Sequence, residues 1–233
     1  MNKQEIEKII NGALTAGRQS LLEPEAKALI SAWGISIPIS VLIKKKKDIE
    51  AEAKKLTTPY VLKVVSQDIL HKSEAGGVVT DIKNIKELNN AWTKMVKNIS
   101  HKMPTPRIDG FLLEEMASRG VEVIIGALRD PQFGPTVMFG LGGIAVELLK
   151  DVSYRLAPLD KKEALEMIRE VKGYPLLTGF RGSKPVDINS LSETIIKLSE
   201  ILIEIEDIKE IEINPLLVYE KGVMAVDVRV VLI

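Results

Sequence analysis

The feature that most constrains the fold of this chain is a lysine inside an apolar segment. Residues 60 to 65 read YVLKVV, a continuous run rich in β-branched side chains that predicts a buried strand, with Lys63 near its centre. Burying an unpaired ammonium group is costly. We therefore expect Lys63 either to extend to solvent at a sheet edge or to meet a fixed anion such as a phosphate.

A histidine and two glycines follow this lysine closely. His71 is one of the 2 histidines in the chain, and it precedes Gly76 and Gly77. The diglycine lets the backbone approach another group before a second predicted strand, residues 78 to 82. A strand lysine, a histidine loop and a diglycine together suggest that this stretch handles phosphate.

Length and composition exclude several classes of protein. The 233 residues suffice for one large domain or two small ones. The 32 basic and 32 acidic side chains balance, which argues against a nucleic-acid-binding surface over the whole protein. The absence of cysteine excludes disulfides and a cysteine nucleophile. Without a long apolar run or a secretion signal, we expect a cytoplasmic protein that has no membrane contact.

The predicted elements indicate an α/β (α+β) fold. Up to about residue 102, amphipathic helices alternate with short strands, and the longest predicted helix covers residues 85 to 102. From Gly110 strands dominate. Asp160 with Glu163 forms a capping-box pattern, and Ser190 with Glu193 predicts the start of the next helix in the same way.

Gly140-Leu-Gly-Gly143 closes one of these strands and opens a predicted helix, residues 144 to 150. Glycines in this position can form a backbone nest that points N–H groups at an anion. The segment lacks the third glycine of a dinucleotide fingerprint and the Lys-Ser/Thr of a P-loop. A tight turn from strand to helix is the alternative interpretation.

The end of the chain predicts a β-hairpin around Glu220-Lys221-Gly222. Strand alternation places Glu212 and Asn214 on one face, and a three-residue loop would bring the Asn214-Pro215 step opposite Asp227-Val228. Two carboxylates and an amide oxygen form a site for a hard cation, and Mg²⁺ is the natural choice. The alternative is an ordinary exposed acidic face, which fits Asp227 poorly because its strand, AVDVRVVL, is apolar.

Four segments together resemble a known family. They are VLKVVSQDILHKSEAGGV, FLLEEMASRGVEVIIG, VMFGLGGIAVELLKD, and EINPLLV followed by AVDVRV. Their order and spacing are similar to those of the ATP-grasp β subunits of ADP-forming acetyl-CoA synthetases, which are related to the succinyl-CoA synthetase β subunits. The resemblance implies an ATP-grasp fold in which two lobes clamp the nucleotide. The expected divisions are an N-terminal helix (1–21), an N-terminal lobe (22–109) and a C-terminal lobe (110–233).

The resemblance also implies roles for individual residues. His71 occupies the position of a second phosphorylated histidine, which the succinyl-CoA enzymes lack. The implied nucleotide-binding residues are Lys63 at the phosphates, Glu114, Glu115 and Met116 in the hinge strand beside the adenine, and Glu122 at the ribose. We also expect Gly76 and Gly77 to bind the nucleotide, because a diglycine allows the backbone to approach it closely. Asn214 and Asp227 would hold Mg²⁺, with Glu212 as a supporting residue.

The implied reaction converts acetyl-CoA, ADP and phosphate to acetate, CoA and ATP through phosphohistidine intermediates. The sequence contains neither a Rossmann-type CoA-binding segment nor a second histidine in a phosphate nest. We therefore expect an α subunit that carries the CoA-binding domain and the first phosphohistidine, in an α2β2 assembly. Two alternatives are a β subunit of a CoA ligase for another acid and a nucleotide-binding regulatory protein. Intact Lys63, His71, Asn214 and Asp227 disfavour the regulatory protein.

Overall fold

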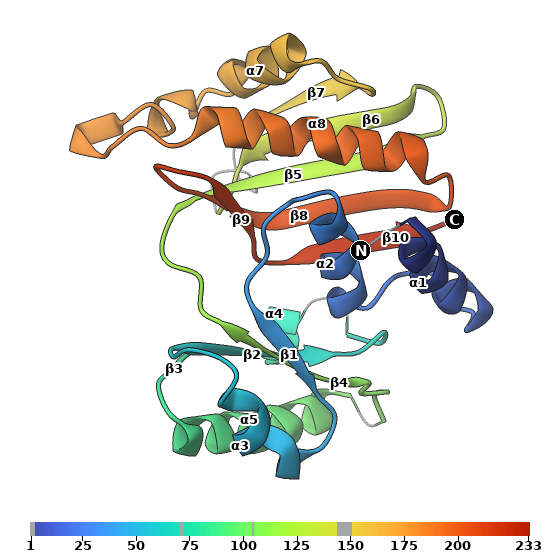
Figure 1. Cartoon of the computed structure of the whole chain (residues 1–233), viewed down its shortest axis with the longest axis vertical. Coiled ribbons are helices and arrows are strands. Elements are labelled where there is room, and N and C mark those ends of the chain that lie inside the picture. Colours follow the sequence, from blue (N-terminus) through green and yellow to red (C-terminus); the bar gives the residue numbers. More distant parts are fainter. Residues whose placement is uncertain (1–2, 70–71, 104, 144–150) are drawn as a thin grey trace. The chain divides into compact units, whose positions relative to one another are not determined.

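The computed structural model of the protein describes residues 3–69, 72–103, 105–143 and 151–233. The chain divides into two compact units, each with its own sheet and helices (Figure 1). Unit 1 contains Met1–Ile37 and Arg119–Ile233, and unit 2 contains Pro38–Ser118. No helix in the described part of the chain is long and apolar enough to cross a membrane.

Unit 2 is a four-stranded antiparallel sheet with the order β1-β4-β2-β3. Its strands are β1 (Ser40–Ile43), β2 (Tyr60–Val65), β3 (Val78–Ile82) and β4 (Gly110–Glu115). Its helices are the 3-10 turn η1 (Lys46–Asp48), α3 (Ile49–Ala53), α4 (Lys72–Ala75) and α5 (Ile85–Lys102). The apolar stripe of α5 is buried in one core with Leu62 and Val64 of β2, because a strand directs alternate side chains to one face.

Unit 1 is built on a larger antiparallel sheet with the order β10-β8-β5-β6-β7, and β9 pairs with β8. Its strands are β5 (Val121–Asp130), β6 (Gly134–Leu141), β7 (Val152–Leu156), β8 (Ile208–Val218), β9 (Val223–Ala225) and β10 (Val228–Leu232). Its helical segments are α1 (Lys3–Thr15), α2 (Glu23–Ala32), α7 (Lys161–Glu170), η2 (Tyr174–Leu176), η3 (Phe180–Gly182) and α8 (Ile188–Glu204).

The helices of unit 1 cover one face of its sheet. Helix α8 packs along β5 and β6, where it buries Val137 and Phe139, and α7 packs on β6 and β7 (Figure 1). Ile125 and Ile211 belong to the same core. Because the side chains alternate, the residues between these positions point to the opposite face of the sheet, which we call the open face.

The boundaries of the two units differ from the predicted lobes. Residues 22–37 belong to unit 1 rather than to the lobe that was expected to begin at residue 22. The reason is that α2 packs on β10 and Ala225 N–H donates to the Ser36 carbonyl at 2.8 Å. Residues 110–118 belong to unit 2, because β4 forms the ladder between β1 and β2.

One of the two predicted helix caps is confirmed and the other is wrong. At α7, Glu163 N–H donates to Asp160 Oδ1 at 2.8 Å, and Asp160 N–H donates to the Glu163 carboxylate at 2.9 Å, which is the predicted capping box. At α8 the cap is Asp187 instead of Ser190, whose N–H donates to Asp187 Oδ1 at 3.0 Å. Helix α8 therefore begins about one turn earlier than predicted.

Asp187 also fastens the hairpin tip to the start of α8. Its Oδ2 accepts from Gly222 N–H at 2.8 Å, and its own N–H donates to the Tyr219 carbonyl at 2.7 Å. The hydrogen bonds from Ser190 N–H and Gly222 N–H lower the pKa of the Asp187 carboxyl below its ordinary value. They do so because they stabilise the ionised form.

We predict that Asp187→Ala lowers the free energy of unfolding by about 1–2 kcal/mol near neutral pH. Because the pKa of Asp187 is lower in the folded state, this contribution is complete above the pKa of the unfolded chain and disappears as the pH falls through the folded pKa. Denaturant unfolding between pH 7 and pH 3 should show the wild-type and variant curves converging at the acidic end. Ser190→Ala is the matched control and should cost less. A difference that stays constant over this range would contradict the role of the ionised carboxylate.

Candidate active site

Lys63 and Glu114 form a buried ion pair in unit 2. Lys63 Nζ lies 2.9 Å from Glu114 Oε2, and both side chains are less than 5% exposed (4% and 2%). In the β2–β4 ladder Lys63 is opposite Leu112 and Glu114 is opposite Val61, so the two charges are diagonal neighbours on one face. The lysine thus meets a fixed anion, which is one of the two alternatives predicted from the sequence, but this anion is a carboxylate of the chain itself and not a phosphate.

This ion pair holds the ammonium group of Lys63 in a fixed position on one face of the sheet. Burial of both charges costs desolvation energy, so the pair by itself is weak evidence for added stability. Its chemical consequence is that Lys63 Nζ is held by β2 and β4 instead of moving on a flexible stem. A phosphate oxygen that reached this ammonium group would meet a donor that is already positioned.

The predicted hinge residues are engaged in backbone contacts. Glu115 Oε1 accepts from Thr57 N–H at 2.7 Å, and Met116 N–H donates to the Pro59 carbonyl at 2.8 Å. Both contacts tie the end of β4 to the segment that enters β2. The Met116 side chain is 38% exposed, so it is available to a planar ligand, whereas its N–H group already has an acceptor.

Packing within unit 2 requires the predicted diglycine. Gly76 has a φ of 72°, in the left-handed region, and follows α4 directly. A Cβ on Gly77 would lie 2.5 Å from Val64 Cγ1, closer than packed atoms tolerate. The two glycines therefore let the chain turn out of α4 and run close to β2, where Val64 N–H donates to the Gly77 carbonyl at 2.8 Å. His71 and Leu70, which precede α4, lie outside the described residues.

In unit 1, a β-bulge presents Asn214 next to Asp227. Ile125 and Val123 of β5 pair with Ile213 and Leu216 of β8, so β8 carries one extra residue between these pairs. Such a bulge redirects the side chains around it. Asn214 N–H donates to the Asp227 carbonyl at 3.1 Å, which places the two residues opposite each other.

Glu212 contacts Asn214 rather than completing a carboxylate pair with Asp227. Asn214 Nδ2 donates to Glu212 Oε1 at 3.2 Å, and Arg229 Nη2 lies 3.8 Å from Glu212 Oε2. Arg229 also pairs closely with Glu210. Because Glu212 accepts the amide N–H of Asn214, the amide oxygen of Asn214 is left for another donor or a cation.

The open face of the sheet in unit 1 carries four of the predicted site residues. They are Glu122, Glu212, Asn214 and Asp227. Glu122 lies at the exposed start of β5, and its carbonyl accepts from Gly142 N–H at 2.7 Å. A Cβ on Gly142 would lie 2.9 Å from Glu122 Cβ, so this contact requires glycine. The predicted helix at residues 144–150 lies outside the described residues.

These donors fit a hard cation that keeps part of its water shell. In the described ranges, no group of three or more His, Asp and Glu side chains is arranged to hold a metal ion. Asn214 and Asp227 offer one amide oxygen and one carboxylate. Mg²⁺ is commonly held by one or two protein ligands, with water and phosphate oxygens at the other positions. A bound nucleotide would be needed to complete the coordination.

Comparison with known proteins identifies related sequences. Residues 12–232 match the ATP-grasp domain family. The chain is 46% identical over 217 residues to the β subunit of ADP-forming acetate–CoA ligase I of Pyrococcus furiosus, and the match covers 93% of this chain and 94% of that protein. It is 43% identical over 222 residues to the ADP-forming 4-hydroxybutyrate–CoA ligase of Nitrosopumilus maritimus, covering 95% of this chain and 32% of that protein.

Solved structures of an acetyl-coenzyme A synthetase from Ca. Korarchaeum cryptofilum are also similar. A complex with coenzyme A, Ca-AMPCP and HgCl⁺ matches with a TM-score of 0.95 at 45% identity, covering 97% of this chain and 99% of that chain. In another complex of that protein, with coenzyme A and Mg-AMPPCP, the phosphohistidine segment points towards the nucleotide-binding site. Its TM-score is 0.85 at 43% identity, with 98% of this chain and 100% of that chain covered.

Proposed function

Because the chain belongs to the ATP-grasp family and, within it, to the β subunits of ADP-forming acid–CoA ligases, we propose that it binds Mg-ADP or Mg-ATP and transfers a phosphoryl group between His71 and the nucleotide. With an α subunit, the complete enzyme would convert acetyl-CoA, ADP and phosphate to acetate, CoA and ATP. The α subunit would contribute the CoA-binding domain and the first phosphohistidine, in an α2β2 assembly.

The observation that carries this proposal is the pairing of Asn214 with Asp227 on the open face. An amide oxygen and a carboxylate on adjacent strands fit the incomplete ligand set that Mg²⁺ takes when a nucleotide supplies the remaining oxygens. Bound Mg²⁺ would neutralise charge on the phosphate oxygens as the phosphoryl group moves. Glu212 would support the site by holding the Asn214 amide.

His71 would act as a covalent carrier. In the direction of ATP formation, the P–N bond of phosphohistidine breaks while a terminal oxygen of ADP forms the new P–O bond, and the imidazole is released. Splitting the transfer in this way replaces one difficult step by two easier ones. Lys63 would contact the nucleotide phosphates, with Gly76 and Gly77 nearby. Glu114, Glu115 and Met116 would border the adenine, and Glu122 would bind the ribose.

A related activity on another acid is the second candidate. The similarity to a 4-hydroxybutyrate–CoA ligase supports it, because that relative is nearly as similar as the acetate enzyme. Assays of ADP-dependent turnover with the α subunit present, using acetyl-CoA and 4-hydroxybutyryl-CoA in parallel, distinguish the two. A regulatory protein that binds nucleotide without transfer would show turnover with neither.

We predict that Asp227→Asn weakens the magnesium-dependent part of ADP binding by at least about tenfold, which corresponds to about 1.4 kcal/mol. The substitution removes one negative charge, but the new amide oxygen can still accept from Val228 N–H, which donates to Asp227 Oδ1 at 3.0 Å. Calorimetric titration of ADP with Mg²⁺ and with a chelator separates the metal-dependent part from the rest.

Glu210→Gln is the matched control, because Glu210 is a carboxylate on the same strand that pairs with Arg229. We expect its magnesium dependence to match that of the wild type. Equal magnesium titrations for Asp227→Asn and the wild-type chain would rule out Asp227 as a ligand.

A further inference from the structure

Arg229 lies beside two carboxylates on the open face of the sheet in unit 1. Val228 and Val230 of β10 are buried in the core, so Arg229 between them points to the open face. There its guanidinium group pairs closely with Glu210, and its Nη2 lies 3.8 Å from Glu212 Oε2. The ladder of β10 and β8 fixes this arrangement, because it aligns Arg229 directly with Glu212.

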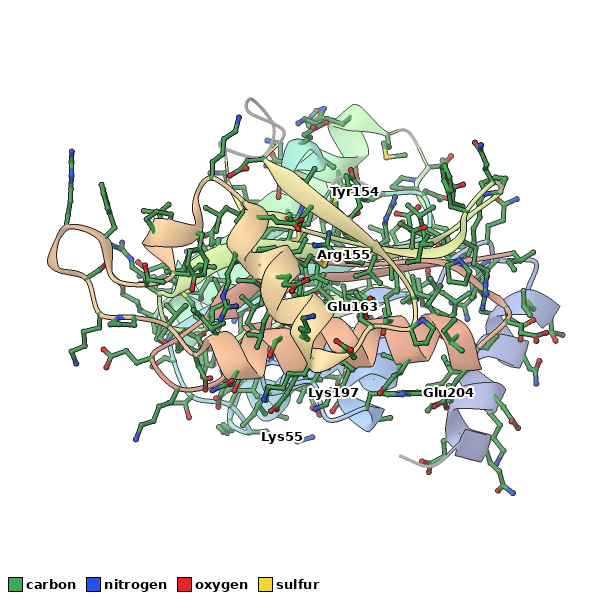
Figure 2. All side chains as sticks on the ribbon, turned by 90° about the horizontal axis from the view of Figure 1, so that it is seen from above. Lys55, Tyr154, Arg155, Glu163, Lys197 and Glu204 are labelled. Carbon is green, nitrogen blue, oxygen red and sulfur yellow. The ribbon has the colours of Figure 1, made fainter. Side chains whose placement is uncertain are left out.

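The charges of α7 and α8 are separated from this cluster by the sheet. Both helices pack against the opposite face, as Figure 2 shows for Glu163 on α7 and Lys197 on α8. Among the described residues, the ion pairs of Arg229 are those with Glu210 and Glu212. The Arg229 side chain is 47% exposed, and ion pairs at such positions add little to stability. The main effect of the guanidinium group is therefore to hold the two carboxylates in place.

The two carboxylate oxygens of Glu212 have different partners. Oε1 accepts from Asn214 Nδ2 at 3.2 Å, whereas Oε2 is the oxygen nearest to Arg229. An ionised carboxylate only accepts hydrogen bonds, so it selects the Nδ2 side of the Asn214 amide and leaves the amide oxygen for a cation. Both oxygens of Glu212 are thus held by protein groups. This agrees with the finding that no three His, Asp or Glu side chains in the described ranges are arranged around a metal position.

The number of protein oxygens at a site decides which divalent cation it prefers. Mg²⁺ keeps several waters and is commonly held by one or two carboxylates beside the phosphates, whereas Ca²⁺ takes roughly six to eight oxygens and accepts bidentate carboxylates. A second carboxylate next to Asp227 would therefore favour Ca²⁺. Glu212 is the residue that could provide it, since a single hydrogen bond joins its side chain to that of Asn214.

We propose that Arg229 sets the metal preference of the proposed site by keeping Glu212 from coordinating the cation. The inference rests on the proposed function, in which Asn214 and Asp227 hold Mg²⁺ together with the nucleotide. Arg229 is a positioning residue, because it acts through Glu212 and provides no ligand itself. Without the guanidinium group, Oε2 of Glu212 loses its partner and the carboxylate turns towards the bound metal. The site then offers two carboxylates and gains affinity for Ca²⁺ relative to Mg²⁺.

The test measures the Kd for ADP by calorimetry, with the chain in excess Mg²⁺ or in excess Ca²⁺. Loss of the positive charge of Arg229 strengthens the binding of both divalent cations through space, but this effect cancels in the ratio of the two Kd values because the cations carry equal charge. We expect Arg229→Met to shift this ratio towards Ca²⁺ by at least about tenfold. Thermal unfolding verifies that the variant folds, as the exposure of Arg229 leads us to expect.

Glu210→Gln is the matched control, because it removes the other carboxylate partner of Arg229 and leaves Glu212 in place. Its ratio of Kd values should stay within about twofold of the wild-type ratio. The double variant Arg229→Met/Glu212→Gln lacks the carboxylate that Arg229 restrains. Its ratio should therefore match that of Glu212→Gln alone, again within about twofold.

An unchanged ratio in Arg229→Met would overturn the inference and leave the proposed function in place. A shift of the same size in the Glu212→Gln background would also overturn it, because Arg229 would then act without Glu212. Equal affinity of the wild-type chain for ADP in Mg²⁺ and in a chelator is a different result. It would contradict the proposed function, and the inference with it.

Discussion

Replacement of His71 by alanine is expected to lower the rate of ATP formation by the assembled enzyme by more than about 10⁴-fold, because removal of a covalent nucleophile eliminates the two-step route. The affinity for Mg-ADP should remain within about twofold of the wild-type value, since the proposed nucleotide contacts come from other residues. Steady-state turnover with the α subunit and calorimetric titration of the isolated chain provide the two measurements.

The chain offers a matched control for this substitution. His101 is the other of the 2 histidines, and it lies exposed in the last turn of α5. His101→Ala should retain nearly full turnover. Unchanged turnover in His71→Ala would refute the role of His71 as the carrier. Loss of Mg-ADP binding in the same variant would show that the histidine has a different role, in holding the nucleotide.

Lys63→Met is expected to affect both stability and nucleotide binding. The substitution leaves the Glu114 carboxylate buried without the ammonium group that lies 2.9 Å away, so the free energy of unfolding should fall by about 3–5 kcal/mol. The affinity for Mg-ADP should fall by at least about 30-fold, because a charged contact to phosphate is lost. Denaturant unfolding and nucleotide titration measure the two effects separately.

A double variant separates the structural role of Lys63 from its proposed function. Lys63→Met/Glu114→Leu replaces both charges with apolar groups and should recover most of the stability, because buried ion pairs can often be replaced at little cost. Its affinity for Mg-ADP should remain low. Glu23 and Lys27 of α2 form a second buried ion pair, with 3.0 Å between Glu23 Oε1 and Lys27 Nζ, in unit 1. Glu23→Leu/Lys27→Met is therefore the matched control and should bind Mg-ADP normally. Wild-type affinity in Lys63→Met/Glu114→Leu would contradict the phosphate contact.

The local pattern of the sequence predicted some elements well. Helix α5 and the α7 capping box follow from periodicity and from side chains within a few residues of each other. The sequence predicted Ser190 as the N-cap of α8, whereas the cap in the structure is Asp187. This difference shows the limit of local reasoning, because Asp187 also accepts a hydrogen bond from Gly222 N–H in the distant hairpin. Strand β7 was not predicted at all, since its five residues give too short a pattern to recognise.

The features that could not be predicted from the sequence depend on pairing between residues that lie far apart in the chain. The division into units depends on β4 pairing with β1 and β2, and no local signal reports this pairing. The partner of Lys63 could have been suspected, because Glu114 is itself a charge in an apolar strand and two such residues often pair. The proximity of Asn214 and Asp227 was predictable because a short hairpin fixes its own register, whereas the bulge that exposes Asn214 was not.

Phosphorylation of His71 by ATP in the isolated chain tests the proposed function most directly. The chain is incubated with γ-labelled ATP and Mg²⁺, quenched in alkali and digested, and the labelled peptide is identified by mass spectrometry. We predict an acid-labile, alkali-stable label on His71 that requires Mg²⁺ and returns to added ADP as ATP. A chain that binds the nucleotide yet remains unlabelled, or that carries the label on another residue, would contradict phosphoryl transfer through His71.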